Sequence, residues 1–189
     1  PTKKNVDNTF TRKMETPKAR AQYMWYNDEM PYTLENSIRA DIAGQVLDMI
    51  YLKKIREEAS AAYSVSAIGR AQLREDKTHS MMLYAVCPMK PEKRQEAVSI
   101  LEQEVKDLAN TCDASMVAKI KELMLKQADD AVKSNGYWYN VIEMYDKYGI
   151  DSHSDYKKLI EAQTPETICS FMKEFNKNGN RLGVVMLPA

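Results

Sequence analysis

The chain has 189 residues, with 27 Lys and Arg side chains against 27 Asp and Glu side chains, so its formal net charge at pH 7 is zero. This length fits one domain that buries a core without disulfide bonds. A balanced charge creates no field that would attract nucleic acid or an anionic membrane, and no apolar run approaches the roughly 20 residues needed to span a bilayer. We therefore expect a soluble protein that binds neither nucleic acid nor a membrane.

The N-terminal part begins with a polar segment. Residues 1–17 should form a linker that enters the domain, with a short strand near Phe10–Met14. Pro1 stands in place of an initiator Met, which suggests a piece of a longer polypeptide. From Ala19 to Tyr26 the sequence alternates between two faces, the period of a strand. Residues 18–189 should form a single domain.

Helices and strands alternate irregularly through the rest of the chain. Apolar residues from Leu34 to Ile50 recur at helical spacing, and this helix should continue to about Glu58. The later elements are expected as strands at Ala62–Ala71, Ser80–Cys87 and Arg181–Leu187, and as helices from Pro91 to about Leu108, from an N-cap at Asp113 to about Lys133, at Tyr137–Tyr148, at Ser154–Ala162, and at Pro165–Phe175 with an N-cap at Thr164. Without regular βαβ repeats, this order predicts an α+β fold. We expect an antiparallel or mixed sheet of four to six strands with helices layered on one face.

The sequence contains no complete catalytic motif. Its two histidines, His79 and His153, are too far apart to form a helical ligand pair, and neither H-E-x-x-H nor H-x-x-E-H occurs. The three cysteines, Cys87, Cys112 and Cys169, form no C-x-x-C and are expected to be buried thiols. The aromatic run "KSNGYWYN" (133–140) lacks a basic surplus, so we interpret it as core packing rather than as a nucleic-acid platform.

One stretch is more specific. The segment "IREEASAAYSVSA" (55–67) resembles a segment of the pitrilysin/insulinase-type zinc metallopeptidases, the inverzincins. The segments "HSMMLYAVCP", "PEKRQEAVSILEQEVKDL", "DASMVAKIKELML" and "TPETICSFMKEFNKNGNRLGVVMLP" follow in the order found in a non-catalytic domain of that family. The resemblance covers about Ala19 to Pro188, and it implies the metallopeptidase-type α+β domain.

In that family the catalytic domain binds zinc through H-x-x-E-H and a distant Glu, and this chain departs from that pattern completely. The resemblance therefore implies a C-terminal, zinc-free domain that is inactive alone and binds no cofactor. Its partner would be a domain or subunit that carries H-x-x-E-H and the zinc, and together they would enclose an extended peptide substrate. The family also implies a soluble protein of the bacterial periplasm or cytoplasm, and the sequence does not decide between these compartments.

The resemblance also implies candidate substrate-binding residues, because an Arg and a Tyr seven residues later reach across to the zinc site in such enzymes. Arg56 and Tyr63 have this spacing. A guanidinium and a phenol can donate hydrogen bonds to the negative charge that develops on a scissile carbonyl oxygen. Metal binding by the neighbouring Glu57 and Glu58 is not expected, since no distant ligand partner accompanies them.

Other interpretations of these residues stay open. Arg56 could cap the helix C-terminus or pair with Glu57 or another surface acid, and Tyr63 could fill the inner sheet face. Ser60 replaces the glycine that the family usually has at this corner. At the level of the whole protein, the alternative functions are a structural or assembly subunit that has lost catalysis, and a peptide-binding module that uses an exposed sheet edge.

Overall fold

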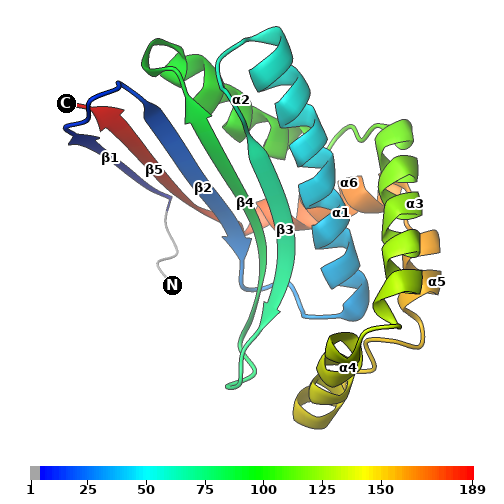
Figure 1. Cartoon of the computed structure of the whole chain (residues 1–189). Helices are drawn as coiled ribbons and strands as arrows, with labels where there is room; N and C mark the ends of the chain where they lie inside the picture. Colours follow the sequence, from blue (N-terminus) through cyan, green and yellow to red (C-terminus); the bar gives the residue numbers. More distant parts are fainter. Residues whose placement is uncertain (1–4) are drawn as a thin grey trace.

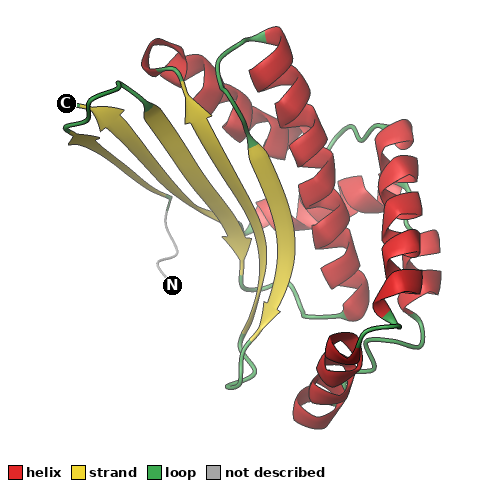
Figure 2. Cartoon of the chain, viewed as in Figure 1, coloured by secondary structure: helices red, strands yellow, loops and turns green. Residues whose placement is uncertain are grey.

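A computed structural model of the chain, described over residues 5–189, shows an α+β domain with two layers (Figure 1). One layer is a five-stranded mixed sheet in the order β1-β5-β2-β4-β3. The helices pack against one face of this sheet, and the other face is open (Figure 2). The predicted fold class, including helices on one face, is confirmed.

The sheet is antiparallel apart from one pair. Strands β1 and β5 run parallel, whereas β5–β2, β2–β4 and β4–β3 are antiparallel. The strands are β1 Val6–Arg12, β2 Ala19–Asn27, β3 Ser66–Leu73, β4 His79–Met89 and β5 Asn180–Pro188.

The helical layer is built mainly on α1, which runs beside β3, while α2 and α6 cover the centre of the sheet. The helical elements are α1 Leu34–Tyr51, the π-helix η1 Leu52–Glu58, the 3-10 turn η2 Pro91–Lys93, α2 Arg94–Asp107, α3 Ala114–Ala131, α4 Asn135–Tyr148, α5 Tyr156–Glu161 and α6 Pro165–Lys177. The predicted N-caps are confirmed, since the side chains of Asp113 and Thr164 accept hydrogen bonds from the first turns of α3 and α6. None of the helices in the described part of the chain is long and apolar enough to cross a membrane.

Two strand boundaries differ from the sequence-based expectation. The first strand lies at Val6–Arg12 rather than near Phe10–Met14. It forms an edge of the sheet, so this part of the predicted linker belongs to the domain. The predicted linker also includes residues 1–4, which lie outside the described residues. Strand β3 begins at Ser66 rather than at Ala62, because the chain makes only an isolated bridge from Ala62 to Met89 before it joins the ladder.

The core lies between the helices and the inner face of the sheet. Alternate residues of β2, from Ala19 to Trp25, are buried as the alternation predicts. They meet the apolar side of α1 and the inner residues of β4 such as Met81 and Leu83, within one continuous cluster. At roughly 25 cal/mol per Å² of apolar surface, this burial is the main source of folding free energy.

The interpretation of residues 133–140 as core packing is wrong. Helix α4 contains no buried residue, and it projects from the body of the domain (Figure 1). Trp138 donates a hydrogen bond from Nε1 to the carbonyl oxygen of Val132, and Tyr137 contacts His153, but both contacts are local. Aromatic residues indicated burial correctly only where the period of their strand or helix also placed them on an inner face.

Helix α1 shields the edge strand β3 at very short range. A Cβ atom on Gly69 would lie 1.7 Å from the carbonyl oxygen of Ala40, and one on Gly44 would lie 1.9 Å from the backbone nitrogen of Gly69. Farther along, Asp48 accepts a hydrogen bond from the backbone N–H of Ala67 at 2.8 Å. The helix thus covers part of this sheet edge and satisfies an N–H that no strand pairs.

This contact predicts that Gly69→Ala destabilises the domain, because the added methyl group would collide with backbone that cannot move aside. The expected loss in the free energy of unfolding is about 1–3 kcal/mol or more, measured by urea denaturation. Gly136→Ala is the matched control, since the nearest atom to its Cβ is 3.5 Å away. Equal stability of the two variants would contradict the close packing of α1 on β3.

Candidate functional site

The predicted site residues lie at the corner between α1 and β3, a segment we call the Arg56–Tyr63 corner (residues 52–65). Sequence spacing predicted an ordinary helix to about Glu58, but the last seven residues form the π-helix η1, in which the N–H of Ala59 bonds to the carbonyl oxygen of Lys54 at 3.0 Å. This wider winding is rare in proteins and often occurs at functional sites. It places Ile55 in the core, while Arg56 is exposed.

The chain reverses direction at Ser60, whose φ of 48° lies in the left-handed region. Ser60 is the position at which the resemblance implied a glycine, a residue that adopts such a φ without steric cost. Ala61 then accepts a hydrogen bond from the backbone N–H of Lys90 at 3.0 Å, and Tyr63 donates from its backbone N–H to Pro88 at 3.3 Å. Backbone bonds to the end of β4 therefore hold the segment on both sides of Ala62.

Two further contacts fix η1 to helix α2. The hydroxyl of Tyr51 donates to the carbonyl oxygen of Leu101 at 2.7 Å, and burial raises the pKa of this phenol well above its ordinary value. Lys54 forms an ion pair with the buried carboxylate of Glu104 at 2.5 Å. These contacts make the corner a rigid platform.

Arg56 and Tyr63 both point away from this platform. The Tyr63 side chain is 67% exposed, so it does not fill the inner sheet face as one interpretation held. Within residues 5–189, no hydrogen bond or ion pair engages the side chain of Arg56 or of Tyr63, and the nearby Glu58 is paired with Lys53 at 4.0 Å. The guanidinium and the phenol therefore keep their donors available.

Two cysteines and one histidine outside the corner have structural surroundings. Burial raises the pKa of Cys87 and Cys112 to about 12, so neither thiol is a nucleophile near neutral pH. Nδ1 of His153 and the Tyr137 hydroxyl share a hydrogen bond of 2.7 Å, and this contact positions the start of α4. Among the residues that the structure describes, no group of three or more His, Cys, Asp or Glu side chains could hold a metal ion.

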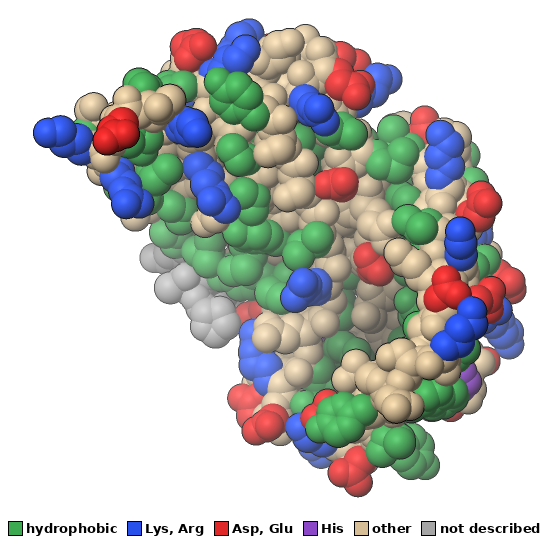
Figure 3. Space-filling model, in the orientation of Figure 1, with side chains coloured by type: hydrophobic (Ala, Val, Ile, Leu, Met, Phe, Trp, Pro, Cys, Tyr) green, Lys and Arg blue, Asp and Glu red, His purple; other side chains and the backbone are tan. Residues whose placement is uncertain are grey.

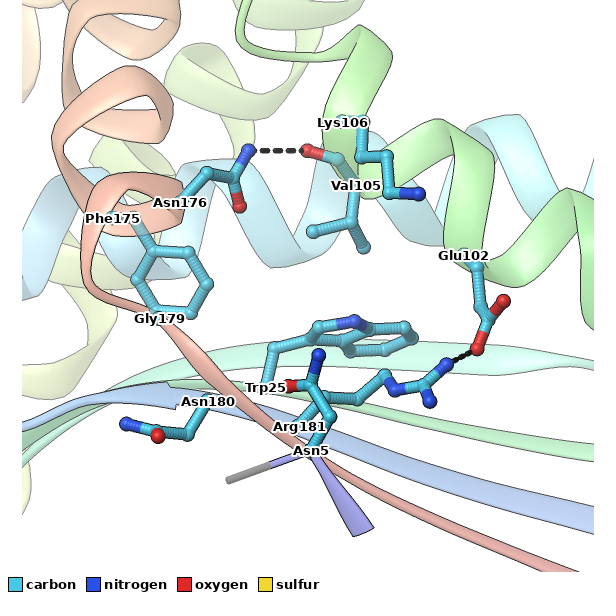
Figure 4. A pocket seen from close by; sticks show the side chains of 10 residues that line it. All are labelled: Asn5, Trp25, Glu102, Val105, Lys106, Phe175, Asn176, Gly179, Asn180 and Arg181. Carbon is cyan, nitrogen blue, oxygen red and sulfur yellow. Dashed lines mark hydrogen bonds and ion pairs between the residues drawn. The ribbon is translucent and has the colours of Figure 1, made fainter. Parts of the chain in front are cut away.

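A cavity of about 250 Å³ lies elsewhere, between α2, α6 and the start of β5 (Figure 4). The indole ring of Trp25 forms one wall and faces Phe175 and Val105. Beside it, Arg181 forms ion pairs with Glu102 and Asp7. The lining offers amide, indole and charged groups for binding, and none of the lining residues comes from the Arg56–Tyr63 corner.

Sequence analysis did not single out these cavity residues. The alternation of β2 predicted only that Trp25 faces inward. No local motif connects Arg181 to Asp7 and Glu102, because the three residues come together through the pairing of β1 with β5 and the packing of α2.

Comparison with known proteins decides the family. The model of the family described as "Peptidase M16 inactive domain" matches residues 1–124 of the chain. The chain belongs to the M16 peptidase family. Among curated proteins, none matches the chain. The predicted resemblance to a non-catalytic, C-terminal domain of pitrilysin-like peptidases is confirmed.

Solved structures of M16 proteases share the fold. The periplasmic protease PqqL from Escherichia coli has a TM-score of 0.76 and 22% identity over 100% of this chain and 21% of its own. The ferredoxin protease FusC, in complex with Arabidopsis ferredoxin, has a TM-score of 0.75 and 17% identity over 96% of this chain and 20% of its own. Pitrilysin has a TM-score of 0.64 and 14% identity over 97% of this chain and 20% of its own. The chain thus spans about a fifth of each protease.

The first half of one of these proteases also shares the fold. The structure of the first half of PqqL matches 97% of this chain, with a TM-score of 0.67 and 12% identity, while the match covers 42% of that half. The same α+β unit therefore occurs in the half-length protein, where it takes less than half of the chain.

The left-handed φ at Ser60 yields a prediction about the corner. Ser60→Gly should keep or slightly raise the free energy of unfolding, because relief of about 1–2 kcal/mol of steric strain offsets the added flexibility of about 0.5–1 kcal/mol. Ser60→Val should lower it, since a β-branched residue tolerates positive φ poorly. Urea denaturation measures both changes. A stable Ser60→Val variant would show that Ser60 does not adopt this conformation.

Proposed function

We propose that this chain is the zinc-free, C-terminal domain of a pitrilysin-like metalloendopeptidase, where it encloses and orients an extended peptide opposite a zinc site in a partner domain or subunit. Arg56 and Tyr63 are its substrate-binding residues. The observation that carries the proposal is the exposure of both donors on a rigid corner, where the described residues leave them unpaired.

The proposal divides the catalytic groups between this domain and its partner. Zinc held by the H-x-x-E-H motif of the partner would activate the attacking water and polarise the scissile carbonyl. The Arg56 guanidinium and the Tyr63 hydroxyl would donate hydrogen bonds to the oxygen of that carbonyl as its negative charge develops. Fixed donors are effective here because they need little reorganisation during the reaction.

The shape of the corner supports a role opposite another surface. Tyr63 projects from the surface of this domain, where it is 67% exposed. Such a donor can serve catalysis only when a second body brings the substrate to it. The relatives supply a precedent for a protein substrate, since FusC is described as a ferredoxin protease in complex with ferredoxin.

The test is made in the full-length polypeptide together with the subunit that carries H-x-x-E-H. Tyr63→Phe and Arg56→Ala should each lower kcat for a peptide by about 10²–10³-fold, with a smaller change in KM, because the lost bond acts mainly in the transition state. Zinc content, measured by mass spectrometry, should not change. Lys126→Ala is the matched control, since Lys126 is exposed on α3 and lies outside the Arg56–Tyr63 corner.

Unchanged turnover in both corner variants would remove the assigned role of Arg56 and Tyr63. If neither the full polypeptide nor its partner contained H-x-x-E-H, the structural or assembly subunit would replace the peptidase as the function.

A further inference from the structure

The cavity between α2, α6 and the start of β5, which we call the Trp25 cavity, combines apolar walls with polar groups (Figure 4). Its walls are the indole ring of Trp25, the phenyl ring of Phe175 and the side chain of Val105, three residues of the core. Its volume is about 250 Å³, whereas an apolar cavity of about 150 Å³ is already large enough to hold benzene. The Trp25 cavity therefore has room for the side chain of one amino-acid residue and part of its backbone. In the view of Figure 3, side chains of both charges lie scattered over the surface of the domain, so the cavity is distinguished by its walls and donors rather than by a strongly charged surround.

Three N–H donors on this lining lack an acceptor within residues 5–189. Nε of Arg181 is buried without a hydrogen-bond partner in this part of the chain, although the terminal nitrogens of the same guanidinium are paired with Glu102 and Asp7. None of the described residues accepts a hydrogen bond from Nε1 of Trp25 or from Nζ of Lys106. Because buried donors in folded proteins are nearly always satisfied, the orphaned Nε–H indicates an acceptor that comes from outside this domain.

The charge of the lining favours an anionic acceptor. Among the lining residues that the structure describes, Lys106 and Arg181 are cationic and Glu102 is acidic, so their formal net charge is +1. Asp7, the second partner of Arg181, does not line the cavity. Lys106 is exposed and forms no ion pair within residues 5–189, so its charge is left to balance that of a ligand.

One lining group is held ready as an acceptor. Asn176 donates a hydrogen bond from Nδ2 to the carbonyl oxygen of Val105 at 3.0 Å, which fixes the orientation of its amide. Figure 4 shows its Oδ1 turned toward the cavity. This oxygen is placed to accept the backbone N–H of a bound amino-acid residue.

We propose that the Trp25 cavity binds the C-terminal residue of a peptide. An apolar side chain packs against Trp25, Phe175 and Val105, while the terminal carboxylate accepts hydrogen bonds from Lys106 and from Nε of Arg181. An ionised carboxylate is a pure acceptor, whereas an internal peptide unit brings an N–H for each carbonyl. A lining with three free donors therefore matches a chain end better than the middle of a peptide, and bonds between ionised partners are the stronger ones.

This ligand class is one that a peptidase produces. Each hydrolysed peptide bond yields one fragment with a new C-terminal carboxylate, so the cavity would bind cleavage products or substrates that have already been shortened. This assignment of the source rests on the proposed function. The chemistry of the cavity does not, because none of its lining residues belongs to the Arg56–Tyr63 corner.

The test is photo-crosslinking of the full-length polypeptide with an N-acetylated tripeptide that ends in photo-leucine, a leucine analogue whose diazirine reacts with neighbouring side chains on irradiation. Mass spectrometry should locate the crosslinks on Trp25, Val105 or Phe175. The same tripeptide with a C-terminal amide should need a concentration about 10-fold higher or more for half-maximal crosslinking, because it loses a charged hydrogen-bond acceptor. An excess of N-acetylleucine should compete, and an equal excess of N-acetylleucinamide should not.

Two lysine variants test the carboxylate contact. Lys106→Gln keeps most of the side-chain length but removes the charge, so half-maximal crosslinking should again need a concentration about 10-fold higher or more. Lys126→Gln, on the exposed surface of α3, is the matched control and should bind like the unmodified protein. Urea denaturation verifies that both variants are folded.

The results separate this inference from the proposed function. Arg56→Ala should crosslink like the unmodified protein, so a loss of turnover in that variant says nothing against the cavity. Equal crosslinking of the acid and the amide would overturn the proposal, as would crosslinks that lie outside the cavity. Unchanged binding by Lys106→Gln would overturn the assigned carboxylate contact.

Discussion

The backbone contact between α1 and β3 determines where the rest of the candidate site lies. Gly44 and Gly69 leave no room for a side chain, so the backbone of the helix packs directly against the backbone of the strand. Asp48 then satisfies the Ala67 N–H at the same edge. From α1 the chain continues through η1 and the turn at Ser60 into β3. Arg56 and Tyr63 are therefore carried on a corner that packing fixes.

The corner also shows how a fold can present reactive donors without a pocket. Tyr51 and Lys54 tie the helix end to α2, and backbone bonds tie the following residues to β4. Tyr51 and the Glu104 partner of Lys54 are buried, whereas Arg56 and Tyr63 are exposed. This division suits a domain that contributes a surface to a site whose metal is held elsewhere.

Much of the architecture could be predicted because burial follows the period of each element. The alternation from Ala19 to Trp25 and the helical spacing after Leu34 indicated the correct inner faces, and the caps at Asp113 and Thr164 marked helix starts. The π-helix and the late start of β3 could not be predicted. They depend on how the chain crosses from α1 to β4, which is a tertiary constraint without a local signal.

The candidate site and helix α4 illustrate the limit of a single domain's sequence. Spacing and family resemblance singled out Arg56 and Tyr63, but nothing local indicated that the aromatic residues of α4 stand outside the core. An isolated domain can leave apolar surface open where its neighbour in the whole protein covers it. The same argument applies to the corner, whose donors lack an acceptor within residues 5–189.

The central claim is that the corner faces a substrate held at a zinc site in another domain. A crystal structure of the complete protein with a bound, uncleaved peptide tests it most directly. The account predicts the Arg56 guanidinium and the Tyr63 hydroxyl within about 2.7–3.2 Å of the scissile carbonyl oxygen. A peptide bound at the zinc with both side chains turned away from it would contradict the account.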